Sequence, residues 1–410
     1  MNDKTRDFIE RNLDADIRQL ALKGCRDKEV DFDTALRQIA GQQTARRKLP
    51  SWATLEGILY PPHLNIEQCS SEQTARYKAD ICQHLISELN LKSSSLIDLT
   101  GGFGVDFVFM SEVFNEAIYV ERDSGLFAIS SENLRILAPK AKCLNRDGVE
   151  ILHTLEHVSM IFMDPARRDD HGARTYGISD CTPDVLEIKD ELLRKADIVM
   201  FKLSPMLDWS KAINDLGKQN IKEVHIVSVQ NECKELLVVL SVKCEKCKIR
   251  VVCTNFLSDS NYELFEFSPS IHHSALHSQH FTLNIHHFLY EPNASIMKAG
   301  CYSEIEEAFH VSQLAPNSHL FTSDTMIDNF PGRKFRIKAI SSMNKQELRN
   351  ALKDIHQANI TVRNFPLPVA ELRKKLKCSD GGETYIFATT LMDKQRILII
   401  CDRLNSVNSN

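Results

Sequence analysis

The sequence predicts an α/β fold built on an open, mostly parallel sheet, followed by smaller α+β domains. Between residues 68 and 242, short apolar runs that suit strands alternate with stretches of helical apolar spacing. A glycine-rich turn, Thr100 to Gly104, follows the first of these runs, and polar residues end the later ones. The chain has 410 residues, which exceeds the usual size of one hydrophobic core, so we expect two or three domains.

The stretch SLIDLTGGFGVD, Ser95 to Asp106, is typical of a strand, a turn and the start of a helix. Its glycines allow a tight turn and let a ligand approach main-chain N–H groups. The spacing does not match a dinucleotide fingerprint, because Phe107 stands where that fingerprint needs a small residue. We therefore expect another type of cofactor site, with a purely structural turn as the alternative.

Acidic residues follow three further predicted strands: Glu121 follows Glu116 to Val120, Asp147 follows Lys140 to Leu144, and Asp164 follows Val158 to Met163. Parallel sheets bind ligands at the carboxyl ends of their strands. We therefore expect these acids and Asp98 to meet in one crevice, although each acid alone would also suit a solvated loop.

The elements around this region complete the predicted sheet. A helix from Gln68 has capping-box spacing in Ser70 and Gln73, and its Ser71 and Lys78 serve either the ligand or helix capping and packing. A helix is predicted from Val185 to Lys195. The strand Asp197 to Leu203 carries Lys202, which forms a structural salt bridge or attracts an anionic substrate. Strands at Val224 to Val229 and Leu236 to Val242 suit a closing antiparallel hairpin.

The acid Asp98 and the Gly102-Phe103-Gly104 turn resemble the class I S-adenosylmethionine-dependent methyltransferases, with Thr100 in place of the usual first glycine. The segments DLTGGFGVD, MDPARRD and FKLSPMLD resemble the core of a bacterial family of these enzymes that has a C-terminal THUMP-like domain. The run from Asn364, NFPLPVAELRKKLKCSDGGETYIFAT, resembles that domain, and Leu289 to Met326 resembles the family's ferredoxin-like insert. The resemblance covers most of the chain from about Gln68 and implies a Rossmann-like core with S-adenosylmethionine as cofactor.

The resemblance also implies roles for single residues. Glu121 would bind the ribose, and an acid after the third strand would bind the adenine amine. The implied cofactor-binding residues are Asp98, Thr100, Gly102, Gly104, Glu121, Asp147 and Asp164, and the implied catalytic residues are Asp164, Arg167 and Lys202. Ala166 and Arg167 stand where related aminomethyltransferases have proline and an aromatic residue, a difference that puts an exocyclic-amine acceptor in doubt.

We predict an N-terminal helical region (1–67), a methyltransferase core (68–275), a ferredoxin-like insert (276–332) and a basic THUMP-like domain (333–410). Residues 333 to 410 hold 15 Lys and Arg and 7 Asp and Glu, whereas the rest of the chain has a net charge of −13. Basic charge concentrated in one domain favours an anionic macromolecular partner. THUMP domains help to place RNA, so the resemblance implies a tRNA or rRNA acceptor. The alternatives are a methyltransferase for a protein or an anionic small molecule, and a non-catalytic RNA-binding protein.

Metal and membrane binding are not expected. Cys244 and Cys247 have metal-ligand spacing but lack a second pair, and six histidines between His272 and His287 have no acid among them. The twelve cysteines are expected to be reduced thiols, and Cys181 or Cys233 is an unsupported candidate nucleophile. The polar N-terminus and the lack of a long apolar run predict a cytoplasmic protein. The polar stretch 169–184 is a candidate substrate lid.

Overall fold

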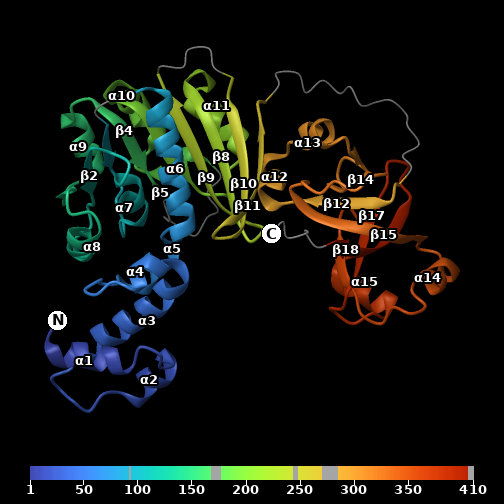
Figure 1. The fold of residues 1–410 in the computed structure, drawn as a ribbon, viewed down its shortest axis with the longest axis horizontal. Coiled ribbons are helices and arrows are strands. Elements are labelled where there is room, and N and C mark those ends of the chain that lie inside the picture. The colour runs from blue at the N-terminus through green and yellow to red at the C-terminus, as the bar shows by residue number, and fades with distance from the viewer. Residues whose placement is uncertain (92–93, 168–176, 243–247, 270–284, 405–410) are drawn as a thin grey trace. The chain divides into compact units, whose positions relative to one another are not determined.

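The computed structural model describes residues 1–91, 94–167, 177–242, 248–269 and 285–404 (Figure 1). These residues form two compact units. The first comprises residues 1–224 and 236–247, and the second comprises residues 225–235 and 248–410. Among the described helices, none combines the length and apolar character that crossing a bilayer requires.

The first unit begins with helices, as the sequence predicts: α1 (Asp3–Arg11), α2 (Ile17–Lys23), α3 (Phe32–Lys48), α4 (Pro50–Ala53) and α5 (His63–Gln68). Contacts with Asn133 and with Phe103 of the glycine-rich turn help to join this region to the residues that follow. The Asn133 side chain exchanges two hydrogen bonds of 2.8 Å with the backbone of Leu59, and the buried Trp52 ring packs edge-on against Phe103, 5.3 Å between centroids. The helical region therefore packs directly behind the glycine-rich turn.

Helix α6 (Glu72–Glu88) runs alongside the sheet (Figure 1). Its N-cap is Ser71, whose hydroxyl accepts a 3.3 Å hydrogen bond from the Thr74 backbone N–H. The prediction that Ser70 caps this helix is therefore wrong by one residue. Ser70 is buried, and its hydroxyl instead donates to the Asp106 carboxylate at 2.8 Å.

The sheet of the first unit has the strand order β8-β9-β7-β4-β1-β2-β3. The strands are β1 (Ser95–Asp98), β2 (Glu116–Val120), β3 (Lys142–Leu144), β4 (Val158–Met163), β7 (Ala196–Leu203), β8 (Ile221–Val229) and β9 (Glu232–Ser241). Strands β3, β2, β1, β4 and β7 pair in parallel, and β9 pairs with β7 in the antiparallel sense. The predicted parallel sheet with a closing hairpin is confirmed.

Helices connect these strands as the alternating pattern predicts: α7 (Val105–Ser111), α8 (Ser124–Leu137), α9 (Gly148–Thr154), α10 (Val185–Lys195) and α11 (Trp209–Leu216). After β4, a short ribbon of β5 (Ala166–Arg167) and β6 (Cys181–Thr182) pairs in the antiparallel sense. Residues 168–176 of the expected lid lie outside the described residues.

In the second unit, β8 lies beside β10 (Arg250–Ser258), which pairs with β11 (Asn261–Phe267). A separate sheet has the order β13-β14-β12-β15-β18-β17-β16. Its strands are β12 (Phe288–Pro292), β13 (Ser312–Gln313), β14 (Phe321–Ser323), β15 (Gly332–Ser342), β16 (Asn359–Val362), β17 (Thr384–Thr390) and β18 (Arg396–Leu404). Its helices are α12 (Ala294–Ala299), α13 (Tyr302–Phe309), α14 (Lys345–Ala351) and α15 (Val369–Leu376).

Period-two alternation on β17 and β18 places apolar side chains on both faces of this second sheet. One face packs against α15 through Leu372, Leu376, Ile386, Leu398 and Ile400, and the other holds Phe335, Phe387, Ile397, Ile399 and Cys401. Strands β17 and β18 pair in the antiparallel sense, and α14 ends at Ala351.

The structure brings an acid to part of the histidine-rich stretch. Asp324 lies 2.7 Å from His286 Nδ1 and 3.6 Å from His287 Nδ1, although the sequence analysis found no acid among these histidines. His272, His273, His277 and His280, as well as Cys244 and Cys247, lie outside the described residues.

Gly148 opens α9 directly against the first strand, and this close approach gives a test of the fold. A Cβ atom at Gly148 would lie 2.1 Å from the carbonyl oxygen of Leu99, so Gly148→Ala must displace backbone. We expect the free energy of unfolding to fall by about 1–3 kcal/mol in urea titrations. Gly125→Ala is the matched control, because its Cβ would meet only the Asp123 carboxylate at 3.3 Å. Equal stability of the two variants would contradict this packing.

Candidate cofactor and acceptor site

The glycine-rich turn between β1 and α7 is held rigidly by its neighbours. A Cβ at Gly101 would lie 2.1 Å from the Tyr119 ring, so only glycine fits there. Gly102 and Gly104 have φ of +59° and +85°, a region that glycine adopts without strain. The Gly102 carbonyl oxygen accepts hydrogen bonds from the Ser130 hydroxyl at 2.9 Å and from the Tyr119 hydroxyl. The turn is therefore fixed before any ligand binds.

Glu121 lies beside this turn, as predicted for an acid at the end of β2. Its Oε2 accepts a hydrogen bond from the Gly102 N–H at 2.8 Å, and its Oε1 accepts one from the Asp123 N–H at 2.7 Å. Each carboxylate oxygen has two lone pairs, so both oxygens retain the capacity to accept a second donor. Glu121 is therefore positioned by the backbone and still able to bind a hydroxyl group.

Asp98 ends β1 and is only 2% exposed. Its Oδ1 accepts a hydrogen bond from the Thr100 N–H at 2.9 Å. Burial, with a smaller contribution from the charges of Asp106 and Asp164, raises the pKa of Asp98 to about 8 against the opposing Thr100 hydrogen bond. In the part of the chain that the structure describes, no salt bridge to Asp98 is found, so the site contains a buried acid that a cationic group would stabilise in its ionised form.

Thr100, which replaces the glycine usual at this position, has a structural role. Its hydroxyl oxygen accepts a hydrogen bond from the Asp164 backbone N–H at 2.6 Å. This bond joins the turn after β1 to the residue that follows β4. Thr100 thus connects Asp98 and Asp164, which lie at the carboxyl ends of two neighbouring parallel strands.

Asp164 and Lys202 form the centre of the predicted acceptor side. Lys202 Nζ lies 2.6 Å from Asp164 Oδ2 and 3.1 Å from Asp106 Oδ2, so one ammonium group bridges two carboxylates. The side chain of Asp164 is 40% exposed, whereas those of Lys202 and Asp106 are 13% and 10% exposed. Asp164 is therefore the member of this group that an acceptor molecule can reach.

Lys78 is a second buried cation near this pair, and the sequence predicts its role only in part. Lys78 of α6 is fully buried, and its Nζ lies 3.0 Å from Asp106 Oδ1. It also donates to the Ser70 hydroxyl at 3.3 Å and to the Thr74 carbonyl at 3.1 Å. The sequence analysis considered Lys78 as a ligand contact or a packing residue, and the structure places it in a buried ionic cluster.

Asp106 is the residue that the sequence analysis missed. Burial alone would raise its pKa, but the ammonium groups of Lys202 and Lys78, together with the Ser70 hydrogen bond, outweigh burial and hold the pKa of Asp106 below its usual range. Asp106 lies in the first turn of α7, where an acidic side chain usually stabilises the helix through its favourable interaction with the helix dipole. The available signal was an acid in an apolar helix, VDFVFM, in which every residue is buried.

The remaining predicted residues contribute less to this arrangement. Asp147 is the N-cap of α9, and its Oδ1 accepts hydrogen bonds from the Val149 and Glu150 N–H groups at 2.8 and 3.3 Å. It lies at the same sheet edge, since the adjacent Gly148 abuts Leu99. Arg167 pairs through its backbone with Cys181, and its side chain lies outside the described part of the chain.

The alternative cysteine nucleophiles do not combine exposure with a lowered pKa. Cys181 is 5% exposed. Burial raises the pKa of the Cys233 thiol, an effect that the nearby Lys298 charge only partly offsets. A nucleophilic cysteine needs a lowered pKa at an accessible position, so neither residue has the required environment.

The chain is similar to known proteins in its C-terminal part and along its full length. A THUMP domain-like family model matches residues 332–403, and a ferredoxin-like domain model matches residues 288–331. A crystal structure of a "putative methyltransferase" from Porphyromonas gingivalis W83 is 28% identical, with a TM-score of 0.83 over 99% of this chain and 100% of that chain.

The chain has a class I methyltransferase fold with ferredoxin-like and THUMP-like domains. The fold class and the resemblance predicted from the sequence are therefore confirmed. The type IIG restriction endonuclease BpuSI is 12% identical, with a TM-score of 0.39 over 57% of this chain and 33% of that chain. A methyltransferase from Agrobacterium tumefaciens is 13% identical, with a TM-score of 0.30 over 42% of this chain and 62% of that chain. These two are too distant to inform function, and no curated protein sequence matches the chain.

The buried carboxyl of Asp98 makes stability depend on pH. Because its folded-state pKa of about 8 lies above the unfolded value of about 3.9, the folded protein binds this proton more tightly, and the resulting stability is lost as the pH rises from 4 to 8. The slope from one proton is at most about 1.4 kcal/mol per pH unit. We expect Asp98→Asn to melt near the wild-type temperature at pH 4 and above it at pH 8. Asp190→Asn, at an exposed helix position, is the control and should show no pH-dependent difference.

Proposed function

We propose that this protein transfers a methyl group from S-adenosylmethionine to a nucleotide of structured RNA. The observation that carries the proposal is the arrangement at the carboxyl ends of the parallel strands. The fixed glycine turn, Asp98 and Glu121 lie on one side of Thr100, and the partly exposed Asp164–Lys202 pair lies on the other.

The residues present suit this cofactor. S-adenosylmethionine carries a cationic sulfonium and ammonium group, and such a group would stabilise the ionised form of the buried Asp98 carboxyl on binding. Glu121 would hold ribose hydroxyls, Gly102 and Gly104 would allow close approach of the backbone, and Asp147 would lie near the adenine. When bound, S-adenosylmethionine supplies an electrophilic methyl group, and alignment with the acceptor then contributes much of the rate.

On the acceptor side, Asp164 would orient the nucleophilic group or accept its proton as charge develops. Lys202 Nζ holds the Asp164 carboxylate in place at 2.6 Å. Asp106 in turn fixes Lys202 at 3.1 Å. Arg167 remains a prediction for contact with an anionic acceptor. The chain thus provides a positioned carboxylate whose partner is anchored below the surface.

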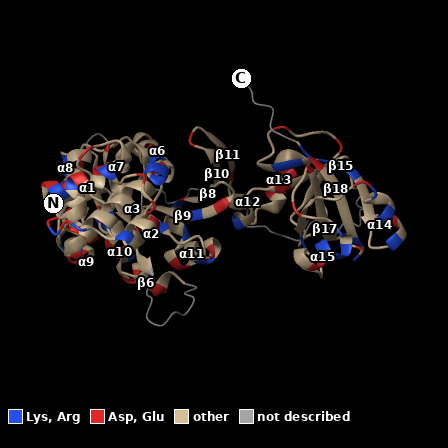
Figure 2. Cartoon of the chain, turned by 90° about the horizontal axis from the view of Figure 1, so that it is seen from below, with Lys and Arg blue, Asp and Glu red and all other residues tan. Residues whose placement is uncertain are grey.

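The RNA acceptor is supported by the THUMP-like match and by the basic charge of residues 333–410, which Figure 2 marks in blue on α14 and its neighbours. Part of this charge is neutralised inside the domain. Arg333 pairs with the buried Glu291, and Lys334 is itself buried and donates to the Asp328 carbonyl at 2.6 Å. These contacts reduce the positive charge that β15 exposes, and exposed cations include Arg336 and three lysines of α15 and its C-cap: Lys374, Lys375 and Lys377.

The test of activity is the transfer of labelled methyl from S-adenosylmethionine to total RNA from cells that lack this gene, with protein and metabolite fractions alongside. We expect nuclease-sensitive label, and we expect Asp164→Asn to reduce transfer by at least about 100-fold, because a positioned acid or base contributes that much. Asp190→Asn, which removes an exposed carboxylate elsewhere in the same unit, should leave transfer unchanged. Label only in protein or metabolites would reject the RNA acceptor, and no label with full cofactor binding would reject the activity.

RNA binding gives a separate test of the C-terminal domain. Lys374→Glu/Lys375→Glu should weaken binding of structured RNA and lower the slope of log K against log salt by about 1 per lost phosphate contact. Glu371→Lys on the same helix is the matched control of opposite sign and should strengthen binding. Affinity measured by filter binding that is unaffected by both changes would show that α15 does not contact RNA.

A further inference from the structure

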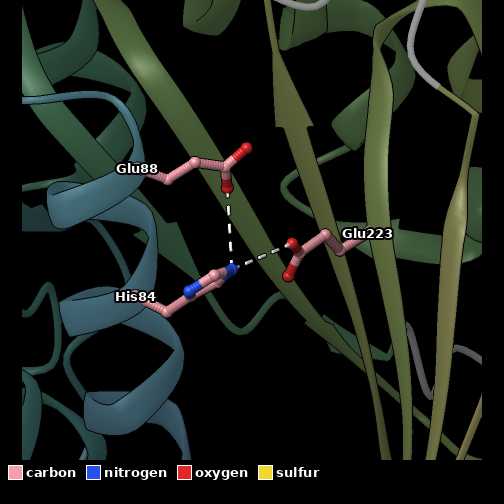
Figure 3. A group of neighbouring side chains, drawn as sticks. All are labelled: His84, Glu88 and Glu223. Atoms are coloured by element: carbon pink, nitrogen blue, oxygen red, sulfur yellow. Dashed lines mark ion pairs between the residues drawn. The ribbon is translucent and has the colours of Figure 1, made fainter.

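Three side chains on the first unit converge away from the candidate site. His84 and Glu88 lie one turn apart on α6 and face Glu223 of β8 (Figure 3). His84 Nε2 lies 3.6 Å from Glu88 Oε2 and 3.9 Å from Glu223 Oε1. All three candidate ligand atoms lie within 4.8 Å of one another. The group thus presents one nitrogen and two carboxylate oxygens to a common point.

The distances in this group fit coordination better than direct hydrogen bonding. Separations of 3.6 and 3.9 Å exceed normal hydrogen-bond lengths. Two ligands about 2.0–2.1 Å from a tetrahedral zinc ion are about 3.3–3.4 Å apart. The two separations from His84 Nε2 are a few tenths of an ångström longer, and the ligand oxygens of Glu88 and Glu223 lie within 4.8 Å of each other, so the half-exposed His84 and Glu88 side chains would rotate to close these gaps around an ion.

The surroundings also orient the group. Glu223 is 3% exposed, so the strand holds its carboxylate in a nearly buried position. Lys222 Nζ donates a hydrogen bond of 2.6 Å to Glu88 Oε1, whereas His84 faces the other oxygen, Oε2. This ion pair leaves Glu88 Oε2 for a metal and limits Glu88 to one coordinating oxygen. The positive charge of Lys222 lowers the affinity of the group for a cation.

We propose that His84, Glu88 and Glu223 bind one Zn²⁺ ion, with water completing a four-coordinate site. A histidine nitrogen with two carboxylate oxygens suits zinc, whereas Ca²⁺ and Mg²⁺ prefer sites made of oxygen ligands alone. The ion would join the C-terminal half of α6 to β8, and its role would be structural. The site is separate from the cofactor and acceptor residues, so the proposal stands without the methyltransferase function.

The test is zinc binding to the full-length protein, measured by calorimetry and by thermal melting in the presence of ZnCl₂, MgCl₂ or CaCl₂. The wild type should bind one zinc ion more than His84→Ala does and should melt higher with zinc but not with magnesium or calcium. Because His84 is half exposed, His84→Ala should keep the fold, and Glu223→Gln provides a second variant. With Co²⁺ as a probe, the wild type should show visible absorption of a four-coordinate ion that His84→Ala reduces.

The matched control is His63→Ala. His63 and Glu67 have the same one-turn spacing on α5 and lie 3.7 Å apart, but the described residues place no third such ligand with them. His63→Ala should bind zinc as the wild type does. The difference from His84→Ala also separates this site from zinc bound by cysteines. Equal zinc stoichiometry in the wild type and His84→Ala, or loss of the same ion in His63→Ala, would overturn the proposal.

Discussion

The candidate site depends on one buried carboxylate, Asp106, held between two ammonium groups. Lys78 approaches one oxygen at 3.0 Å and Lys202 approaches the other at 3.1 Å. A buried charge without a partner costs several kcal/mol, so α6, α7 and β7 must meet in the register that brings these three groups together. Replacing such a cluster with apolar residues is often neutral or stabilising, so stability alone does not explain its presence. Its geometric consequence is that Lys202 is fixed beside Asp164.

The charges around Asp98 and Asp164 show how one site gives two carboxyl groups different properties. Asp164 is partly exposed and has an ammonium group 2.6 Å away, whereas Asp98 is buried and receives a hydrogen bond from Thr100. Burial raises the pKa of Asp98 to about 8. An arriving cation would therefore stabilise the ionised form of Asp98, whereas Asp164 is already paired with Lys202. This difference matches a cofactor-facing role for the first acid and an acceptor-facing role for the second, as we propose.

Much of the fold and part of the site could be predicted from the sequence, because their signals are local. β1, β2, β4 and β7 are apolar runs bounded by polar residues, and the glycine spacing marks the turn between β1 and α7. The ionic cluster has no such signal, because Lys78 and Asp106 lie on different helices, Ser70 precedes the first of them, and each residue taken alone also suits an ordinary structural role. Their burial follows from the packing of α6 on α7, which only the tertiary structure shows. For the same reason, the sequence does not predict that Glu223 of β8 lies beside His84 of α6, because the two residues are far apart along the chain.

Helix α6 links these observations. Its N-terminal half carries Lys78 into the buried cluster, and its C-terminal half pairs with β8 through Glu88 and Lys222, 2.6 Å apart. A helix attached at both ends has little freedom to slide or rotate over the sheet, because either movement would separate a buried or half-buried ion pair. Lys78 is therefore positioned partly by contacts beyond the cluster itself. The placement of Lys202 against Asp164 consequently rests on the packing of α6 as well as on the strands that carry these two residues.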